Sequence, residues 1–330
     1  MSEQIYPWFS QQWEYFTRLG QTQTLPHALL LAGPEGIGKH QFARMMVATL
    51  LCEHPADPFL ACGECKHCHL FEARTYPDFV HVTMEENENV ISVDVIRAMI
   101  SKLYLTRHFE NYKVALIETA DAMNVNAANA ILKTLEEPPE HTILILVSSH
   151  PQRLPATIRS RCQLVSMHAP DEQQAYSWLQ KFSAEVNWEP LLKVAQGGPL
   201  RALEFHQTDL LDQRISIMNG FLGLFERDAR PLEISTKFES VEFSLASHWI
   251  QSLIIDLLRI KSAENPITLE NPDFYRPLLA LAPRLRVPLI IDFWQLLIER
   301  KRIYDKSLNF KLFIESMVLQ VHKLAAKNLT

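Results

Sequence analysis

The feature that most constrains the fold is a short apolar run that leads directly into a glycine-rich loop. Residues 28–32 are all apolar, and the seven positions after them include Gly33, Gly36, Gly38 and Lys39. The chain has only nine glycines, so three within six positions form a marked concentration. The order is that of a buried strand, a tight loop and a helix, since residues 39–51 have apolar residues at helical spacing. This order predicts the phosphate-binding turn of a parallel α/β domain.

This loop matches the phosphate-loop pattern G-x-x-x-x-G-K-[ST] at every fixed position except the last, where His40 stands. The glycines would let backbone N–H groups surround a phosphate, and Lys39 would reach its β and γ oxygens. The missing hydroxyl removes a magnesium ligand, for which an imidazole is a poor substitute. Weak nucleotide binding and a purely structural loop that caps a helix are therefore both open.

The acidic pair that an ATPase needs is also incomplete. A candidate strand at 112–117 is followed by Glu118 and Thr119, where an Asp-Glu pair would hold magnesium and polarise water. Asp121 lies too far along the chain to be the same group. Two parts of one hydrolytic site are thus degraded, and ATP hydrolysis by this chain is not expected.

Apolar runs alternate with helical patterns along the first half of the chain. Besides the strand at 112–117, another is expected at 143–147, with a helix at about 126–137 that two prolines end. This alternation over residues 1–168 predicts a parallel sheet covered by helices on both faces.

Beyond residue 168 the strand signal fades and helical patterns dominate. Longer helices with apolar stripes are expected at 209–226, 241–262, 287–303 and 309–326. The predicted organisation is a phosphate-loop domain at 1–168 with a cysteine module at 52–68, a small helical domain at 169–207 containing two or three short helices, and a helical domain at 208–330.

Four cysteines in the first domain have the spacing of a metal-binding knuckle. The pattern C-x9-C-x2-C-x2-C is formed by Cys52, Cys62, Cys65 and Cys68, in a stretch with few residues that favour a helix or strand. Each C-x2-C turn places two thiolates at a separation that suits tetrahedral zinc. Because four thiolates leave no open position, the prediction is a structural zinc site.

Two alternatives to this zinc site remain. An iron–sulfur cluster could occupy the same cysteines, or one of the nearby histidines could replace a cysteine as ligand, namely His54, His67 or His69. Cys162 is far away in the sequence and is expected to be an ordinary buried thiol.

Composition favours a cytosolic globular protein. The chain of 330 residues is 47% hydrophobic and 21% charged, which suits a full core rather than disorder. Its net charge of −6 requires any nucleic-acid contact to come from a local patch. The start of the chain is not cationic and no apolar run reaches membrane-spanning length, so we expect neither a secretory signal nor a membrane span. The five cysteines are an odd number in a chain without an export signal, so we expect reduced thiols and a cytoplasmic location.

Further stretches resemble a known protein family. Residues 129–139 closely resemble a segment shared by the bacterial clamp-loader subunits of the AAA+ class. Residues 151–155, followed by Ser160-Arg161-Cys162, are similar to the strand-to-finger region of that family, and a cysteine insert after the loop helix is typical of it. The similarity covers residues 1–206 and, more loosely, a helical C-terminal part in which 309–312 resembles the start of a collar helix.

The resemblance implies a non-motor subunit of the DNA polymerase III clamp loader, without ATPase activity of its own but part of the polymerase complex. The motor subunits gamma and tau keep an intact phosphate loop, whereas an eroded loop with a retained cysteine module is typical of the non-motor subunit. Leu200 stands where motor subunits have an arginine that senses the γ-phosphate, with Arg201 one residue away. At this point ATP binding by the chain is doubtful.

The same resemblance implies partners and a role for one residue. A collar at 208–330 would join the chain to gamma or tau and to delta, and the assembled complex would load the sliding clamp onto primed DNA. Arg161 would point across a subunit interface into a neighbour's ATP, as an arginine finger.

Other interpretations stay open on the sequence alone. The chain could be a gamma-like ATPase motor, or a stand-alone nucleic-acid-binding protein built on its cysteine module. Arg159 and Arg161 could be an ordinary solvated pair, since that is the usual state of exposed arginines. Residues 136–139 could be only a helix end, and Ser148-Ser149, where the family has a polar sensor beside the phosphate, could be only a strand end.

Overall fold

The computed structural model describes residues 5–56, 59–84, 90–226, 229–238, 241, 243–262, 269–303 and 310–328. Its contacts divide the chain into two compact units. One consists of Met1–Trp178 with Gly197–Leu200, and the other of Leu179–Gln196 with Arg201–Thr330. The division into three domains with boundaries at residues 168 and 207 remains a prediction.

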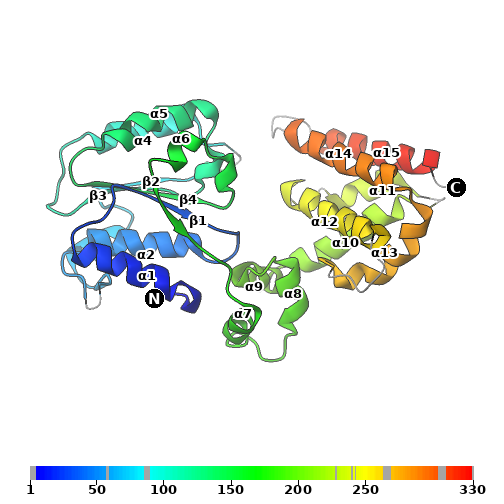
Figure 1. Ribbon diagram of the computed structural model, residues 1–330, viewed down its shortest axis with the longest axis horizontal. Coiled ribbons are helices and arrows are strands. Elements are labelled where there is room, and N and C mark those ends of the chain that lie inside the picture. Colours follow the sequence, from blue (N-terminus) through cyan, green and yellow to red (C-terminus); the bar gives the residue numbers. More distant parts are fainter. Residues whose placement is uncertain are drawn as a thin grey trace. The chain divides into compact units, whose positions relative to one another are not determined.

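The first unit contains a five-stranded parallel sheet in the order β2-β3-β4-β1-β5 (Figure 1). The strands are β1 (Ala28–Ala32), β2 (Phe79–Val82), β3 (Lys113–Ile117), β4 (Thr142–Ser148) and β5 (Gln163–Ser166). The strands predicted at 28–32, 112–117 and 143–147 are confirmed to within one residue as β1, β3 and β4. The short strands β2 and β5 lie at the two edges of the sheet.

Helices cover both faces of this sheet, as predicted (Figure 1). One face carries α1 (Ser10–Gln21) and α2 (Lys39–Leu51), and the other carries α4 (Val93–Leu103) and α5 (Val125–Glu136). Successive residues of a strand point to opposite faces. Leu29 and Leu31 of β1 therefore join the core beneath α1 and α2, whereas Leu30 joins the core beneath α4 and α5.

A helix that was not predicted begins within the last three residues of the cysteine-rich stretch at 52–68. Helix α3 (Lys66–Glu72) begins inside the stretch. Its N-cap is Cys65, whose sulfur accepts a hydrogen bond from the backbone N–H of Cys68 at 3.4 Å. A cysteine thus takes the place of the usual oxygen-bearing cap, which composition rules do not anticipate.

Shorter elements complete the first unit. They are the 3-10 turns at Pro7–Phe9, Ala120–Ala122 and Pro151–Arg153, helix α6 (Ala156–Arg159), and helix α7 (Glu172–Leu179), which ends at the first residue of the second unit.

The second unit is helical throughout its described residues. Besides three 3-10 turns at Thr236–Phe238, Pro272–Phe274 and Ala282–Arg284, its helices are α8 (Trp188–Val194), α9 (Pro199–Gln207), which begins within the first unit, α10 (Leu210–Gly223), α11 (Pro231–Ser235), α12 (Phe243–Ser262), α13 (Tyr275–Leu281), α14 (Val287–Ile303) and α15 (Phe310–Asn328). The four long predicted helices correspond to α10, α12, α14 and α15, and Asn309 lies outside the described residues. The short helices α11 and α13 were not predicted. None of the described helices combines the length and apolar character that crossing a membrane requires.

A buried polar network links α10 to α12 in the second unit. The Arg214 guanidinium is 1% exposed and donates to the Asp273 carboxylate at 2.6 Å and to the Asn271 side-chain oxygen at 2.7 Å. Asn271 donates in turn to the buried Asp256 carboxylate at 2.8 Å. Because Arg214, Asn271 and Asp256 are withdrawn from water, their stabilisation depends on the hydrogen bonds that link them.

Candidate functional site

The glycine-rich loop has the strand–loop–helix context that the sequence predicted. It joins β1 to α2, and Gly36 and Gly38 adopt left-handed backbone conformations with φ of 71° and 94°. A Cβ atom on Gly38 would also lie 2.3 Å from the Tyr6 ring. Glycine is therefore required at position 38 both by its conformation and by the close approach of an aromatic side chain.

The lysine of the loop is held by neutral oxygens of its own domain. The Lys39 ammonium donates to the Pro34 carbonyl at 2.6 Å and to the Ser149 hydroxyl at 3.1 Å, and the residue is 2% exposed. Burial lowers the pKa of Lys39 to about 8, although Glu35 and Asp121 act to raise it. Ser149, which directly follows β4, thus lies beside the loop lysine where the family resemblance places a polar sensor.

Two segments close over the loop. The Trp8 indole N–H donates to the Ile37 carbonyl at 2.9 Å, and the Tyr6 and Trp8 rings stack at 4.9 Å. On another side, the Leu200 backbone N–H donates to the Gly36 carbonyl at 2.9 Å. A Cβ atom on Gly198 would lie 2.7 Å from the Glu35 carbonyl oxygen, which shows how closely this segment approaches the loop.

Leu200 and Arg201, at and beside the position where motor subunits are expected to have a sensing arginine, make different contacts. Leu200 contributes its backbone N–H to the loop, as above. The guanidinium of Arg201 lies 5.7 Å from the centre of the Phe205 ring, on its own helix.

The acidic pair of an ATPase does not assemble at the end of β3. Glu118 Oε1 instead lies 2.8 Å from Nε2 of His81, and this hydrogen bond lowers the pKa of Glu118. Burial lowers the pKa of His40, so this imidazole is neutral at pH 7. Thr119 only precedes a 3-10 turn, without a side-chain capping bond. His40 is thus neutral, and Glu118 is hydrogen-bonded to His81 rather than paired with a second carboxylate.

The four cysteines converge on one point. Their sulfur atoms all lie within 4.8 Å of one another, with Sγ–Sγ distances of 3.6 Å for Cys52–Cys62, 3.9 Å for Cys52–Cys65 and 4.0 Å for Cys62–Cys68. Tetrahedral coordination with Zn–S bonds near 2.3 Å places sulfur atoms about 3.8 Å apart. Among the residues that the structure describes, this is the one cluster of possible ligands compact enough for a metal ion.

Backbone groups further favour thiolates at this cluster. The N–H groups of Cys62, Cys65 and Cys68 each point at a cysteine sulfur at 3.4 Å. The neighbouring histidines are placed differently: His67 is buried with Nδ1 3.0 Å from the Leu51 carbonyl oxygen, and the His54 side chain is 81% exposed beside Glu53. The donor set therefore fits a closed tetrahedral thiolate site made by cysteines alone.

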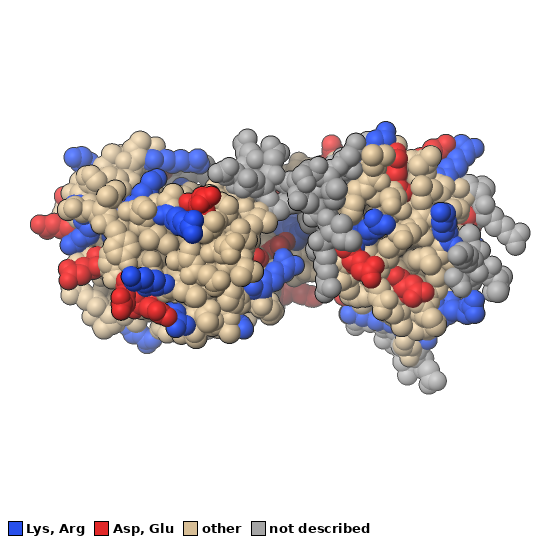
Figure 2. Space-filling view, turned by 90° about the horizontal axis from the view of Figure 1, so that it is seen from above, with Lys and Arg blue, Asp and Glu red and all other residues tan. Residues whose placement is uncertain are grey.

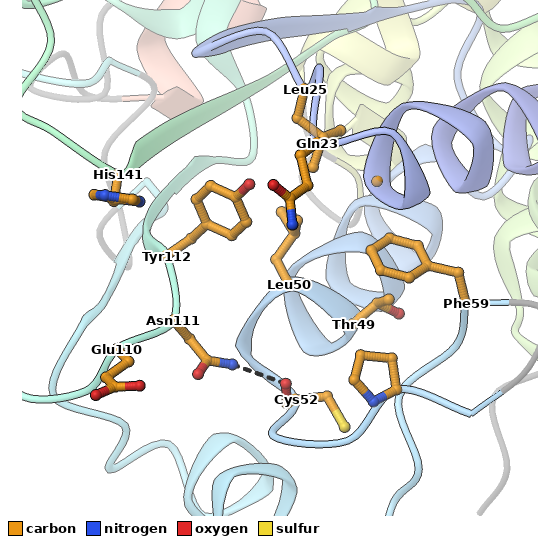
Figure 3. Close-up of a pocket in the computed structure, with 12 residues that line it drawn as sticks. Gln23, Leu25, Thr49, Leu50, Cys52, Phe59, Glu110, Asn111, Tyr112 and His141 are labelled. Carbon is orange, nitrogen blue, oxygen red and sulfur yellow. Dashed lines mark hydrogen bonds between the residues drawn. The ribbon is translucent and has the colours of Figure 1, made fainter.

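The cysteine module is bonded to the sheet through one asparagine (Figure 3). Asn111, just before β3, donates from its side chain to the carbonyl of Cys52 at 2.8 Å and to that of Leu51 at 3.2 Å. A cavity of about 330 Å³ lies alongside, between the ends of α1 and α2, the module and the segments that lead into β3 and β4. Phe59 of the module contacts α1 at Gly20, where a Cβ atom would lie 2.2 Å from the ring.

Arg161 lies between α6 and the edge strand β5, and its guanidinium pairs with α5. Nε donates to Oε1 of Glu136 at 2.8 Å, Nη2 lies 2.5 Å from the same oxygen, and Nη1 donates to the Thr157 carbonyl at 3.0 Å. About a third of the Arg161 side chain is exposed. Arg159 is exposed and has no such pair among the described residues, so the two arginines are not equivalent. The neighbouring Cys162 is a buried thiol whose pKa burial raises to about 11.

Sequence reasoning missed several of these contacts. Neither Tyr6 nor Trp8 was expected at the phosphate loop, and Glu136 was not expected to pair with Arg161. Both aromatic residues precede the first helix without any motif, while Glu136 lies within a segment quoted above only for its family resemblance. No local pattern in the sequence links residues that meet only after folding.

The fold and site together define a clamp-loader subunit of the AAA+ class. The defining features are a parallel α/β domain with a phosphate loop, a cysteine module after the loop helix and a helical C-terminal part. The family profile described as "DNA polymerase III, delta subunit" matches residues 9–171, and the one described as "DNA polymerase III, delta subunit, C terminal" matches residues 208–323.

Individual relatives agree with these profiles. The DNA polymerase III subunit delta′ of Pseudomonas aeruginosa is 35% identical over 323 residues, which cover 96% of this chain and 97% of the relative. The corresponding subunit of Escherichia coli strain K12 is 32% identical over 258 residues, 77% of this chain and 76% of the relative. The subunit tau of Bacillus subtilis is 34% identical over 204 residues, 59% of this chain and 34% of the relative.

The chain belongs to the family of DNA polymerase III delta′ subunits. It is therefore a component of the clamp loader and part of the polymerase III holoenzyme, which confirms the family and the clamp-loader membership inferred from the resemblance.

Proposed function

We propose that this subunit does not hydrolyse ATP and that it supplies Arg161 to ATP bound on a neighbouring gamma or tau subunit. The observation that supports this proposal is the contrast between the two cations. Lys39 is buried and bonded to its own loop and to Ser149, whereas the Arg161 guanidinium reaches the surface beside an edge strand. One cation is available to a neighbour, and the other is not.

A guanidinium suits this role for a chemical reason. The transferring γ-phosphoryl group spreads negative charge over its equatorial oxygens, and an arginine supplied from another subunit stabilises that charge. The planar fork of arginine can donate to two phosphate oxygens at once, whereas a lysine ammonium acts as a point charge. Arg161→Lys is therefore not expected to keep the function.

The chain's own loop lacks the parts needed for hydrolysis. His40 offers no hydroxyl to magnesium, and Glu118 pairs with His81 instead of standing beside a second carboxylate. The contacts of Trp8 and Leu200 with loop carbonyls add a steric reason, because a nucleotide would have to displace or avoid both segments. We infer that any nucleotide binding at Gly33, Gly36, Gly38 and Lys39 is weak.

The metal proposed for the cysteine cluster is Zn²⁺, held by Cys52, Cys62, Cys65 and Cys68. With four thiolate ligands it would have no open coordination position, so it would supply a cross-link rather than catalysis. The cross-link joins the end of α2 to α3, and Asn111 connects it to the sheet.

The proposed partners follow from the family. The helical region at 208–330 would form the collar that joins the chain to gamma or tau and to delta in the cytoplasm, and the complex would load the sliding clamp onto primed DNA. Figure 2 shows acidic and basic side chains interspersed over the described surface on the face in view, which does not favour a stand-alone nucleic-acid-binding protein.

The test is the ATPase rate of a reconstituted loader, stimulated by clamp and primed DNA, with wild-type or substituted subunit. Arg161→Ala should lower the rate partially, since only one ATP site loses its arginine, and Arg161→Lys should not restore it. Arg159→Ala, an exposed arginine two residues away, is the matched control and should keep the wild-type rate. Equal rates for Arg161→Ala and Arg159→Ala would show that Arg161 is an ordinary surface residue.

A further inference from the structure

We propose that Glu136 is the positioning residue for Arg161: it orients the guanidinium so that part of its donor fork faces a neighbouring subunit. This inference rests on the proposed function, because it concerns how Arg161 is presented to a neighbour's ATP. It is carried by the contacts of the two side chains in the isolated subunit.

The guanidinium is oriented by two acceptors, the Glu136 carboxylate on its Nε–Nη2 edge and the Thr157 carbonyl at Nη1. A guanidinium has five N–H groups, one on Nε and two on each terminal nitrogen. Glu136 takes the N–H of Nε and one from Nη2, and the Thr157 carbonyl takes one from Nη1. The Ser160 hydroxyl, 3.5 Å from Nη1, is at the limit of a hydrogen bond. One N–H of Nη2 and one weakly bonded N–H of Nη1 remain for an external acceptor.

Those two remaining groups suit a phosphate. They belong to the two terminal nitrogens, so together they can donate to two oxygens of one phosphoryl group. Because three other N–H groups are bonded within the subunit, the plane of the fork is set before the neighbour arrives. An arginine that must first be ordered loses side-chain entropy on binding, so such pre-organisation favours the productive arrangement.

The location of Glu136 explains why it holds a cation. It is the last residue of α5, where the helix dipole places partial negative charge, so a carboxylate there is unfavourable without a cation beside it. Arg161 supplies that cation from a segment 25 residues later. The Glu136 side chain is still 49% exposed and the Arg161 side chain 34% exposed, so the pair contributes little to folding stability and can be altered without unfolding the domain.

The proposal predicts the result of a double-mutant cycle on the ATPase rate of the assembled loader. Glu136→Ala should lower the clamp- and DNA-stimulated ATPase rate by a substantial part of the loss caused by Arg161→Ala, and Glu136→Gln, which keeps one acceptor oxygen, should lower it less. In an Arg161→Ala background, Glu136→Ala should have no further effect, because Glu136 acts only through Arg161. Glu137→Ala, which removes the adjacent exposed carboxylate, is the matched control and should keep the wild-type rate.

A second measurement tests the pair without any partner. In the isolated subunit, the Nε–H proton of Arg161 should exchange slowly with water in an NMR spectrum of the arginine side chains. This protection should be lost in Glu136→Ala and kept in Glu137→Ala. Zinc content and thermal unfolding of each variant serve as checks that the fold is intact.

The outcomes separate the two proposals. If Arg161→Ala lowers the rate but Glu136→Ala does not, or raises it, Arg161 acts in trans and the positioning role of Glu136 is wrong. The positioning role would also be wrong if Glu136→Ala had the same effect with Arg161 present and in the Arg161→Ala background, because the carboxylate would then act independently of Arg161. If Arg161→Ala has no effect, the proposed function fails and the positioning role fails with it.

Discussion

The ammonium group of Lys39 donates a hydrogen bond to the hydroxyl of Ser149, 3.1 Å away, across the carboxyl ends of the adjacent strands β1 and β4. The second acceptor of Lys39 is the Pro34 carbonyl of the same loop. Neither acceptor carries a charge, so burial dominates and lowers the pKa of Lys39 to about 8. A lysine paired with a phosphate would experience the opposite shift.

This environment predicts a pH dependence of folding stability. The unfolded chain keeps the Lys39 proton up to about pH 10.5, whereas the folded protein releases it above about pH 8. Between these values the unfolded state binds more protons, so the free energy of unfolding should rise with pH, by at most about 1.4 kcal/mol per pH unit. The buried charge is costly below pH 8, and Lys39→Met should therefore be tolerated at pH 7.

The measurement is urea unfolding of wild-type protein and Lys39→Met at pH 7, 8, 9 and 10. The wild type should gain stability relative to the variant over this range. Lys133→Met, which removes an exposed lysine of α5, should keep the wild-type slope. If the free energy of unfolding changed with pH equally in wild type and Lys39→Met, the lowered pKa of the buried Lys39 would be contradicted.

The isolated protein should have no ATPase activity above background. This expectation rests on His40, Glu118 and Thr119, each of which we expect to remove a part of the magnesium site. The triple variant His40→Thr, Glu118→Asp, Thr119→Glu should acquire measurable turnover if the remaining architecture is competent. Steady phosphate release by the wild-type chain alone would instead favour a gamma-like motor.

Purified protein should contain about one zinc per chain, measured by elemental analysis. Each of Cys52, Cys62, Cys65 and Cys68 changed to Ser should lose the metal, because a structural site needs all four thiolates. Cys162→Ser is the control and should keep it, since this thiol is buried far from the cluster. Iron in place of zinc would support an iron–sulfur cluster instead, and absence of any metal would refute a metal site at these cysteines.

Removal of zinc should unfold the cysteine module before the rest of its domain. The module is local in sequence, while the sheet has its own cores above and below. Hydrogen exchange after chelation should therefore rise first in residues 59–72 and at the side chain of Asn111, which is bonded to Cys52. Simultaneous exchange of β1 and β4 would show that the metal supports the whole domain.

Arg214→Met should destabilise the helical unit by about 3 kcal/mol, because it leaves the buried Asn271 oxygen and the Asp273 carboxylate without their cation. Scanning calorimetry of the full chain measures the change. The control is Lys193→Met, which breaks an exposed ion pair with Glu189 on the same helix. It should change the free energy of unfolding by no more than about 0.5 kcal/mol. Similar small effects of both variants would mean that the network around Arg214 relaxes without cost.

The central strands could be predicted because they are apolar on both faces. Strands β1, β3 and β4 are buried along their whole length, and each contains a continuous apolar run of four or five residues. The edge strand β5 has one buried residue, Val165, among four, and its pattern carries no such signal. Its position follows from pairing with β1, which is a tertiary contact.

The candidate site divides in the same way. The convergence of the four cysteines was predictable because their spacing is a local property, and the phosphate loop was predictable because its glycine and lysine positions are local. The pairing of Glu136 with Arg161 joins two segments 25 residues apart, and the contact of Trp8 with Ile37 joins two segments 29 residues apart. Such contacts depend on how helices pack against the sheet, which spacing rules do not encode.

The order of the strands has a consequence for synthesis on the ribosome. Strand β1 pairs only with β4 and β5, and β4 begins at residue 142. At about 5–20 residues per second, an apolar strand would wait roughly 5 to 20 seconds for its first partner to be translated. The cysteine module, whose four ligands lie within residues 52–68, is complete well before then. The nascent chain can therefore bind the proposed zinc while the strand that will lie inside the sheet is still exposed to chaperones.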